Sequence, residues 1–196
     1  MINTIIKDIP LQFETMSTSF SPGCIDRGTL AMLSIADFAP EDKVLDLGCG
    51  YGVVGILTAK LIGTERVFMS DIEQTAVDIA LKNAFLNGVP GIQAVKSDGF
   101  RDITEKDFTV ILSNPPYHTD FSVAKHFIEK GFNRLAIGGR MYMVTKRKDW
   151  YKNKLTAIFG GTAVHEIDGY YIFCSQKRTS QYSSSGDNNS SNSRKP

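Results

Sequence analysis

Short apolar runs alternate with stretches of helical periodicity through most of the chain, a pattern typical of a doubly wound α/β sheet. Seven runs have the length and composition of strands: Val44–Leu47, Arg66–Met69, Ile92–Val95, Thr109–Leu112, Arg140–Thr145, Thr162–Ile167 and Tyr170–Cys174. Asp168-Gly169 separates the last two runs, and this dipeptide favours a tight antiparallel hairpin. We therefore expect an α/β, Rossmann-like sheet of seven strands that ends in a C-terminal antiparallel hairpin.

Helices are expected between these strands, and one of them has a clear end. A stripe of Val77, Leu81 and Ala84 predicts a helix that stops at Asn87-Gly88, since this pair is a common C-cap signal. The other expected helices are Val53–Leu61, Tyr151–Phe159 and one that contains Val123, Phe127 and Leu135.

Composition divides the chain into three parts. An N-terminal segment, residues 1–24, precedes one expected domain, residues 25–176. The remainder, residues 177–196, consists largely of Ser and Asn and contains no aliphatic residue. Such a segment buries too little apolar surface to offset the entropy lost on ordering, so we expect a disordered tail.

Length, charge and cysteine content exclude several classes of protein. With 196 residues, 42% of them hydrophobic, the chain can form a sizeable core without metal or disulfide crosslinks. The three cysteines show neither zinc-ligand spacing nor an even count, so we expect no metal site. A net charge of +1 produces no overall field that attracts nucleic acid. The chain has neither a signal peptide nor an apolar stretch near ~20 residues, so we expect a cytoplasmic protein with no membrane partner.

A glycine-rich turn follows the first expected strand of the sheet. Gly48, Gly50 and Gly52 lie where a ligand approaches the backbone of an open α/β sheet, beyond the carboxyl end of a strand. These glycines alone leave the ligand open, because Gly50 and Gly52 also begin the fingerprint of dinucleotide-binding proteins, which Gly55 completes.

Two acidic residues favour a nucleoside ligand other than a dinucleotide. Asp71 ends the second strand, 19 residues beyond Gly52 (71 − 52), where its carboxylate can accept hydrogen bonds from both hydroxyls of a ribose. Asp46, beside the turn, would repel a pyrophosphate but suits a cationic ammonium group or a water that bridges to it. Methionine attached to adenosine has both features, so it fits better than NAD does.

The tetrapeptide Asn114-Pro115-Pro116-Tyr117 follows the fourth strand, and its prolines require a loop there. The Asn114 side-chain oxygen and the Pro115 carbonyl can accept both hydrogens of a planar amine and stabilise the charge that develops on its nitrogen. Tyr117 can stack on the plane of the acceptor and hold it at attack distance. This chemistry needs no dedicated base, because the ammonium product loses its proton readily to water.

A local basic cluster departs from the overall neutrality. Six basic residues stand against one acid, Asp149, so the local charge is 6 − 1 = +5; the six are Arg140, Lys146, Arg147, Lys148, Lys152 and Lys154. Trp150 and Tyr151 are interleaved with them as possible stacking platforms, which together suit the phosphates and bases of an RNA. The alternative is a solvated helix start with Trp150 in the core.

Four segments resemble the class I S-adenosylmethionine-dependent methyltransferases, and within them the small methyltransferase-domain group. Val44–Gly52 is similar to the first motif of that class, and Phe20–Thr29 and Asn83–Val89 resemble two further segments of the group. Asn114–His118 resembles the Asn-Pro-Pro-Phe-His loop of bacterial ribosomal RNA guanine-N2 methyltransferases of the RsmC and RlmG type, with Tyr in place of Phe.

The resemblance implies a seven-stranded methyltransferase sheet, S-adenosylmethionine as cofactor and guanine N2 of ribosomal RNA as acceptor, in free RNA or in a ribosomal subunit assembly intermediate. Catalytic roles then go to Asn114, Pro115, Pro116 and Tyr117. The cofactor site would consist of Asp46, Gly48, Gly50, Gly52, Asp71, Ile72, Asp98 and Asn114, with Asp98 accepting from the adenine amine. Tyr117 and His118 would contact the substrate, His118 through a phosphate or ribose. The basic cluster adds Lys146 and Lys148 as further substrate contacts.

Other functions stay open at this point, because adenine, guanine and glutamine side chains all present a planar nitrogen to such a loop. Adenine N6 methylation of tRNA or other RNA and glutamine methylation in a protein are alternatives within the enzyme class. A module that binds the cofactor or RNA and supports assembly without catalysis is a third. A nicotinamide-dependent dehydrogenase is the fourth.

Overall fold

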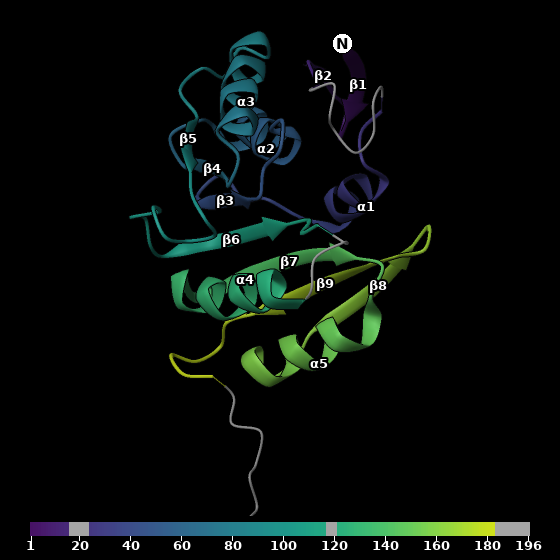
Figure 1. Ribbon diagram of the computed structural model, residues 1–196, viewed down its shortest axis with the longest axis vertical. Helices are drawn as coiled ribbons and strands as arrows, with labels where there is room; N and C mark the ends of the chain where they lie inside the picture. The colour runs from purple at the N-terminus through teal and green to yellow at the C-terminus, as the bar shows by residue number, and fades with distance from the viewer. Residues whose placement is uncertain (16–23, 117–120, 183–196) are drawn as a thin grey trace, which may run out of the picture.

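The computed structural model describes residues 1–15, 24–116 and 121–182, and its centre is a seven-stranded mixed sheet (Figure 1). The strand order is β5-β4-β3-β6-β7-β9-β8, with β9 antiparallel to both β7 and β8. The strands are β3 Val44–Leu47, β4 Val67–Asp71, β5 Gln93–Lys96, β6 Phe108–Ser113, β7 Leu135–Thr145, β8 Ala163–Ile167 and β9 Tyr170–Gln176. The predicted α/β sheet with a C-terminal antiparallel hairpin is confirmed.

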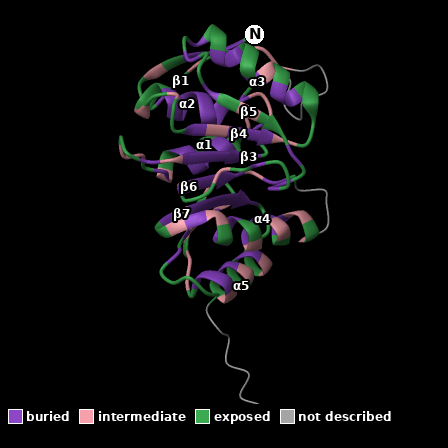
Figure 2. Ribbon diagram, turned by 90° about the vertical axis from the view of Figure 1, so that its left-hand side faces the viewer, coloured by how far each residue is buried: buried purple, intermediate pink, exposed green. Residues whose placement is uncertain are grey.

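Helices cover both faces of the sheet, so each face has its own core. The helices are α1 Arg27–Ile35, α2 Val53–Ile62, α3 Gln74–Leu86, α4 Phe121–Arg134 and α5 Lys148–Phe159. Residues of α1, α2 and α3 pack with Val44 of β3 on one face, whereas α4 and α5 pack with Leu45 on the other. Adjacent residues of a strand point to opposite faces, which is why β3 is apolar along most of its length. Figure 2 shows the buried strands between helices whose outer surfaces are exposed.

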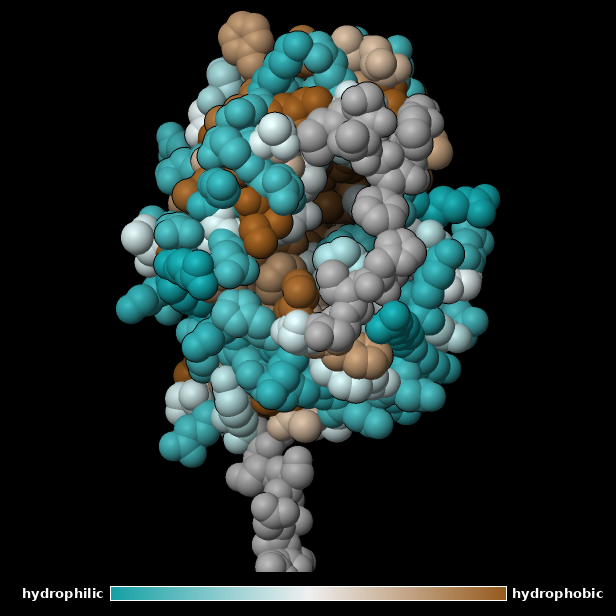
Figure 3. Space-filling view, in the orientation of Figure 1, coloured by the Kyte–Doolittle hydropathy of each residue, from teal (hydrophilic) through white to brown (hydrophobic). Residues whose placement is uncertain are grey.

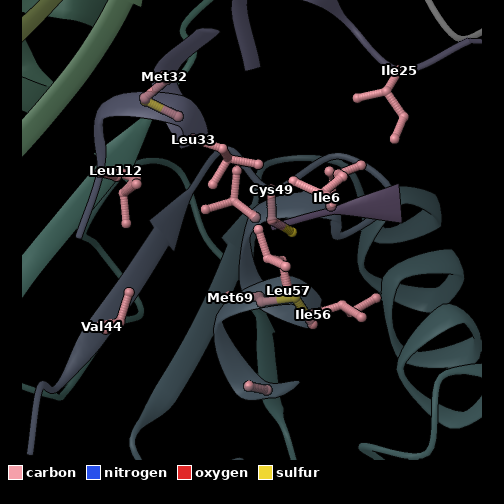
Figure 4. Close-up of a cluster of buried hydrophobic side chains, with 14 of the residues drawn as sticks. Ile6, Ile25, Met32, Leu33, Val44, Cys49, Ile56, Leu57, Met69 and Leu112 are labelled. Atoms are coloured by element: carbon pink, nitrogen blue, oxygen red, sulfur yellow. The ribbon is translucent and has the colours of Figure 1, made fainter. Parts of the chain in front are cut away.

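An additional hairpin, β1 Ile2–Ile6 and β2 Ile9–Phe13, extends the first of these cores. No helix or strand was expected in residues 1–24. Ile6 of β1 lies with Leu33 of α1 and Leu57 of α2 in the cluster drawn in Figure 4.

Two asparagines, Asn83 of α3 and its C-cap residue Asn87, hold this hairpin in place. Asn83 accepts from the backbone nitrogen of Glu14 at 2.8 Å and donates to its carbonyl at 2.9 Å. Asn87 makes the same pair of bonds to Gln12, at 3.0 and 2.7 Å. Asn83 and Asn87 are four positions apart and lie on one side of the helix, while Gln12 and Glu14 are two positions apart and point their backbone groups to the same side. The two side chains therefore make the hydrogen bonds that a neighbouring strand would make.

Two boundaries differ from the sequence expectations. Leu135, expected in a helix, instead begins β7, since α4 ends at Arg134. Lys177, assigned to the tail, is buried, and its Nζ donates to the Leu135 carbonyl at 2.7 Å. Tyr182 packs edge-on against Phe132, with ring centroids 5.0 Å apart. Residues 177–182 thus contact the domain, whereas residues 183–196 lie outside the described part of the chain.

Two kinds of feature are absent from the described residues. None of their helices is both long and apolar enough to cross a membrane. In the same ranges, no three His, Cys, Asp or Glu side chains form a group that could hold a metal ion.

Candidate active site

The carboxyl ends of β3, β4 and β6 bring the candidate residues to one edge of the sheet. Asp46 of β3 is in register with Met69 of β4 and with Leu112 of β6. Because all three strands are parallel, the residues two positions further along also share a level: Gly48, Asp71 and Asn114. The chain order of the sheet reverses between β3 and β6, and ligands of open α/β sheets bind at such a reversal.

Hydrogen bonds tie the glycine turn to the end of β4. The backbone nitrogens of Gly48 and Cys49 both donate to the Ser70 carbonyl, at 2.8 and 2.9 Å. Gly50 has a φ of 55° and its nitrogen donates to the Asp71 carboxylate at 2.9 Å. A Cβ on Gly50 would meet nothing within 4 Å, so the turn has open space beside it.

At Gly52, by contrast, neighbouring side chains leave no room for a Cβ. Its φ is 93°, and a Cβ there would lie 3.0 Å from Ile56 and 3.2 Å from Ala80. Gly52 therefore lets α2 begin close against α3, while Gly50 leaves room for a ligand.

The Asp71 carboxylate keeps acceptor capacity in this arrangement. Its two oxygens accept from the nitrogens of Gly50, at 2.9 Å, and of Glu73, at 3.1 Å. An ionised carboxylate has about four lone-pair sites, so two backbone bonds leave room for the two hydroxyls of a ribose. Ile72, the next residue, is 56% exposed, which leaves an apolar surface beside the same edge.

Asp46 is an acid buried beneath the glycine turn. It is 3% exposed, and its carboxylate accepts from the backbone nitrogen of Gly55 at 2.9 Å. Burial raises the pKa of Asp46 to about 7, the Gly55 hydrogen bond opposes this rise, and the nearby Asp71 adds to it. A cation bound beside the turn would favour the ionised form of Asp46, as expected for the ammonium of an amino acid.

The side chain of Asn114 is held by the beginning of α1. Its Nδ2 donates to Asp26 Oδ1 at 2.8 Å and to Thr29 Oγ1 at 3.0 Å. Asp26 is also the N-cap of α1, where the same Oδ1 accepts from the Thr29 nitrogen at 2.9 Å. Asn114 is half-buried, Pro115 is buried and Pro116 is exposed. The loop thus begins at the sheet edge with its amide group fixed by a distant helix.

Asp26 and Thr29 were missed as site residues in the sequence. The residue type of Asp26, directly before an apolar helical pattern, signals a helix N-cap. Its contact with Asn114 joins residues 88 positions apart and has no local signal.

Two of the other predicted site residues, Tyr117 and His118, lie outside the described residues. The structure describes a third, Asp98. Asp98 is exposed, and its carboxylate pairs with Arg101 at 3.3 Å. Gly99, next to it, packs under the ring of His126.

The basic cluster of the sequence is divided by the fold. Arg140 pairs with Asp42 at 3.2 Å near the amino end of the expected strand, and Lys154 pairs with Glu129 of α4. Neither residue lies at the edge of the sheet that carries Asp71 and Asn114, so fewer than six basic residues can form the predicted patch. Lys146, Arg147 and Lys148 directly follow β7 in the chain.

Three consecutive cations stand over aromatic rings at the end of β7. Lys146 lies 4.9 Å from the centre of the Tyr170 ring and Lys148 lies 5.0 Å from that of Tyr171. Arg147 lies 4.9 Å from the ring of Phe121, the first residue of α4. All three cations are exposed, and the ion pairs found within residues 1–15, 24–116 and 121–182 include none of them.

Trp150 and Tyr151, the expected stacking platforms, already stack on other aromatic side chains of the protein. Trp150 is half-buried and stacks on Phe121, with ring centroids 4.3 Å apart. Tyr151 is 4% exposed and stacks on Phe173. Tyr151 therefore belongs to the core and presents no face to a base.

The residues at this edge fit a nucleoside cofactor that carries an amino acid. In the view of Figure 3 the surface is hollowed, with hydrophobic residues in its depth, in the region where α1, α2 and the end of β6 meet in Figure 1. A Cβ on Gly48 would first meet Phe127 at 4.0 Å, and one on Gly50 would meet nothing. Open backbone, an acid for hydroxyl groups and a second acid for an ammonium group thus occur together.

Known proteins are similar to most of this chain. A family model, the methyltransferase small domain, matches residues 10–174. Ribosomal RNA small subunit methyltransferase C of Pseudomonas putida (strain GB-1) is 32% identical over 173 residues, which cover 86% of this chain and 52% of that protein. The protein of the same name from Serratia proteamaculans is 32% identical over 161 residues, 80% of this chain and 45% of that one.

A solved structure is similar over most of the chain. The 16S rRNA N2 G1207 methyltransferase (RsmC) of T. thermophilus, in complex with AdoMet and guanosine, has a TM-score of 0.82 and 26% identity. The match covers 90% of this chain and 50% of that one. This chain therefore spans about half the length of the relatives it matches.

Replacing Asp46 by Asn tests whether this buried acid holds a proton. In the folded state its pKa of about 7 lies above the ordinary value of 3.8. Between these values the folded state binds more proton than the unfolded state, so the Asp46 contribution to stability falls as pH rises from about 4 to 7. Asp46→Asn keeps an acceptor for Gly55 but does not titrate. Its unfolding free energy relative to the parent protein should therefore rise across this window, by up to about 4 kcal/mol.

Urea unfolding of both proteins at pH 4 and pH 8 measures this change. A difference in unfolding free energy that stays constant between the two pH values would show that Asp46 titrates normally.

Proposed function

This chain belongs to the methyltransferase small domain family, and from that premise we propose that it is an S-adenosylmethionine-dependent N-methyltransferase acting on guanine N2 of ribosomal RNA. The relatives named ribosomal RNA small subunit methyltransferase C and the similar structure with bound AdoMet and guanosine support this choice. The observation that carries the proposal is the position of Asn114, level with Gly48 and Asp71 at the edge of the sheet.

The cofactor would be held by the turn and the two acids. Asp71 would bind the ribose hydroxyls, the backbone at Gly48 and Gly50 would approach the amino-acid part, and Asp46 would favour its ammonium. Ile72 would cover one side of the adenine, and Asp98 would accept from the adenine amine after leaving Arg101. When bound, S-adenosylmethionine supplies an electrophilic methyl group on a sulfonium centre.

Asn114 and Pro115 would prepare the acceptor nitrogen. The lone pair of an exocyclic amine is delocalised into its ring, so the nitrogen attacks poorly until it is drawn out of the ring plane. Two carbonyl oxygens, Oδ1 of Asn114 and the backbone oxygen of Pro115, would accept the two amine hydrogens and stabilise the positive charge that develops. Pro116 would restrict the loop, Tyr117 would stack on the base and His118 would contact a phosphate or ribose.

Lys146 and Lys148 would bind phosphates of the RNA next to the target nucleotide. Their contacts with Tyr170 and Tyr171 restrict both side chains before RNA arrives, so less entropy is lost on binding. A guanine in a duplex has its N2 amine in the minor groove, so an unpaired or flipped nucleotide is the expected target. A ribosomal subunit or an assembly intermediate would present such a nucleotide.

Methyl transfer from a radiolabelled donor, followed by digestion of the RNA to nucleosides, tests the function. Unmethylated small ribosomal subunits and their extracted RNA should yield N2-methylguanosine. N6-methyladenosine or labelled protein would replace guanine N2 by the alternative acceptors. Cofactor binding without transfer to any of these would favour a non-catalytic module. Stabilisation by NADH but not by S-adenosylhomocysteine would favour a dehydrogenase.

Asn114→Ala should lower kcat by about a hundredfold while cofactor affinity stays nearly unchanged, since one preorganised polar contact to the transition state is lost. Kinetics of label transfer and calorimetric binding of S-adenosylhomocysteine measure the two effects. Asn133→Ala, which removes an exposed asparagine from the far end of α4, is the matched control and should retain full activity. Unchanged kcat in Asn114→Ala would remove this side chain from the mechanism.

Lys146→Ala combined with Lys148→Ala should raise KM for RNA about tenfold and reduce the slope of log affinity against log salt by about two, one for each lost phosphate contact. The control pair Lys106→Ala and Lys130→Ala removes the same charge from exposed positions elsewhere. RNA affinity and salt dependence that match those of the control pair would exclude the two residues from the RNA interface.

A further inference from the structure

We propose that Asp26 is a positioning residue that fixes the amide of Asn114 with its oxygen toward the acceptor amine. The inference deepens the proposed function, and its kinetic part rests on that function. Asp26 is far from Asn114 in sequence and lies at the beginning of α1, yet its Oδ1 is 2.8 Å from Asn114 Nδ2.

The chemistry of the contact determines which end of the amide faces α1. A carboxylate only accepts hydrogen bonds, so the group that Asn114 turns toward Asp26 must be its NH2. Thr29 Oγ1, 3.0 Å from the same nitrogen, is a second acceptor. With Nδ2 held by two acceptors, the opposite end of the amide is the carbonyl Oδ1. A rotation of 180° would place two oxygens against each other.

A charged acceptor also changes the strength of the group it holds. A hydrogen bond from an amide N–H to a carboxylate polarises the amide and increases the negative charge on its oxygen. Oδ1 of Asn114 thereby becomes a better acceptor for an amine whose nitrogen gains positive charge during methyl transfer. Asp26 thus acts on the reaction through Asn114, without contact to the substrate.

Packing fixes the start of α1, and therefore Asp26, against the sheet. Asp26 Oδ1 accepts from the Thr29 nitrogen, and the positive end of the helix favours the carboxylate there. Gly28 is buried, and a Cβ at this position would lie 2.8 Å from the ring of Tyr170 in β9. Only a glycine allows this approach, so the first turn of α1 sits at a defined distance from β9.

Substitutions at Asp26 can separate positioning from helix capping. Serine caps helices as well as aspartate does but is one bond shorter, so Asp26→Ser keeps the cap and loses the contact with Asn114. Asp26→Asn keeps the length and an acceptor oxygen but loses the charge. We expect kcat to fall about tenfold in Asp26→Ser and by a smaller factor in Asp26→Asn, with KM for the cofactor unchanged in both. Asp78→Ser, an exposed acid of α3, is the matched control.

A double-mutant cycle shows whether the effect passes through Asn114. In the Asn114→Ala background, Asp26→Ser should lower kcat no further, because the group it orients is gone. An additional tenfold loss in that background would overturn the proposal. So would an unchanged kcat in Asp26→Ser, or a loss that the melting temperature explains.

Nuclear magnetic resonance tests the contact without reference to activity. The side-chain amide signals of Asn114 are those that disappear in Asn114→Ala. Exchange of these protons with water should accelerate about tenfold in Asp26→Ser, and should stay unchanged in Asp78→Ser. Unchanged exchange in Asp26→Ser would refute the positioning contact. Failure of the parent protein to transfer any methyl group would refute the proposed function alone.

Discussion

The parallel pairing of β3 with β4 on one side and β6 on the other is the constraint from which the rest of the site follows. Parallel strands in register end at about the same level, so the residues at their carboxyl ends lie near one another at one edge of the sheet. A turn of glycines, a carboxylate and an amide thus come together from three distant parts of the chain. The hydrogen bonds from the turn to Ser70 and Asp71 then hold two of these strand ends together.

Features with a local cause were predictable from the sequence. The positive φ angles of Gly48, Gly50 and Gly52 and the tight turn at Asp168-Gly169 follow from residues that adopt such angles easily. The hairpin of β1 and β2 gave no such signal. Its turn uses Lys7 and Asp8, with φ of 49° and 63°, and Pro10 weakens the strand pattern. Its hydrogen bonds to Asn83 and Asn87 join residues 69 and 75 positions apart, so they have no local signal either.

The site residues that lie at the ends of strands were predictable from the sequence. Asn114 and Pro115 come directly after a strand, and Asp46 and Asp71 lie at or near the carboxyl ends of two others, so their common edge could be expected. Asp26 could be recognised as a helix cap but not as a partner of Asn114. The extent of the basic cluster could not be predicted for the same reason: Arg140 and Lys146 are close in sequence, but Arg140 lies inside β7 and Lys146 follows its carboxyl end. The partner of Asn114 and the extent of the basic cluster both depend on which distant segments the fold brings together.

A crystal structure with S-adenosylhomocysteine bound would test the central claim most directly. We expect ribose hydroxyls within hydrogen-bonding distance of Asp71, the amino-acid part along the glycine turn, and the sulfur atom facing the segment that begins at Asn114. A cofactor product found at another edge of the sheet, or one whose sulfur faces away from Asn114 and Pro115, would contradict it.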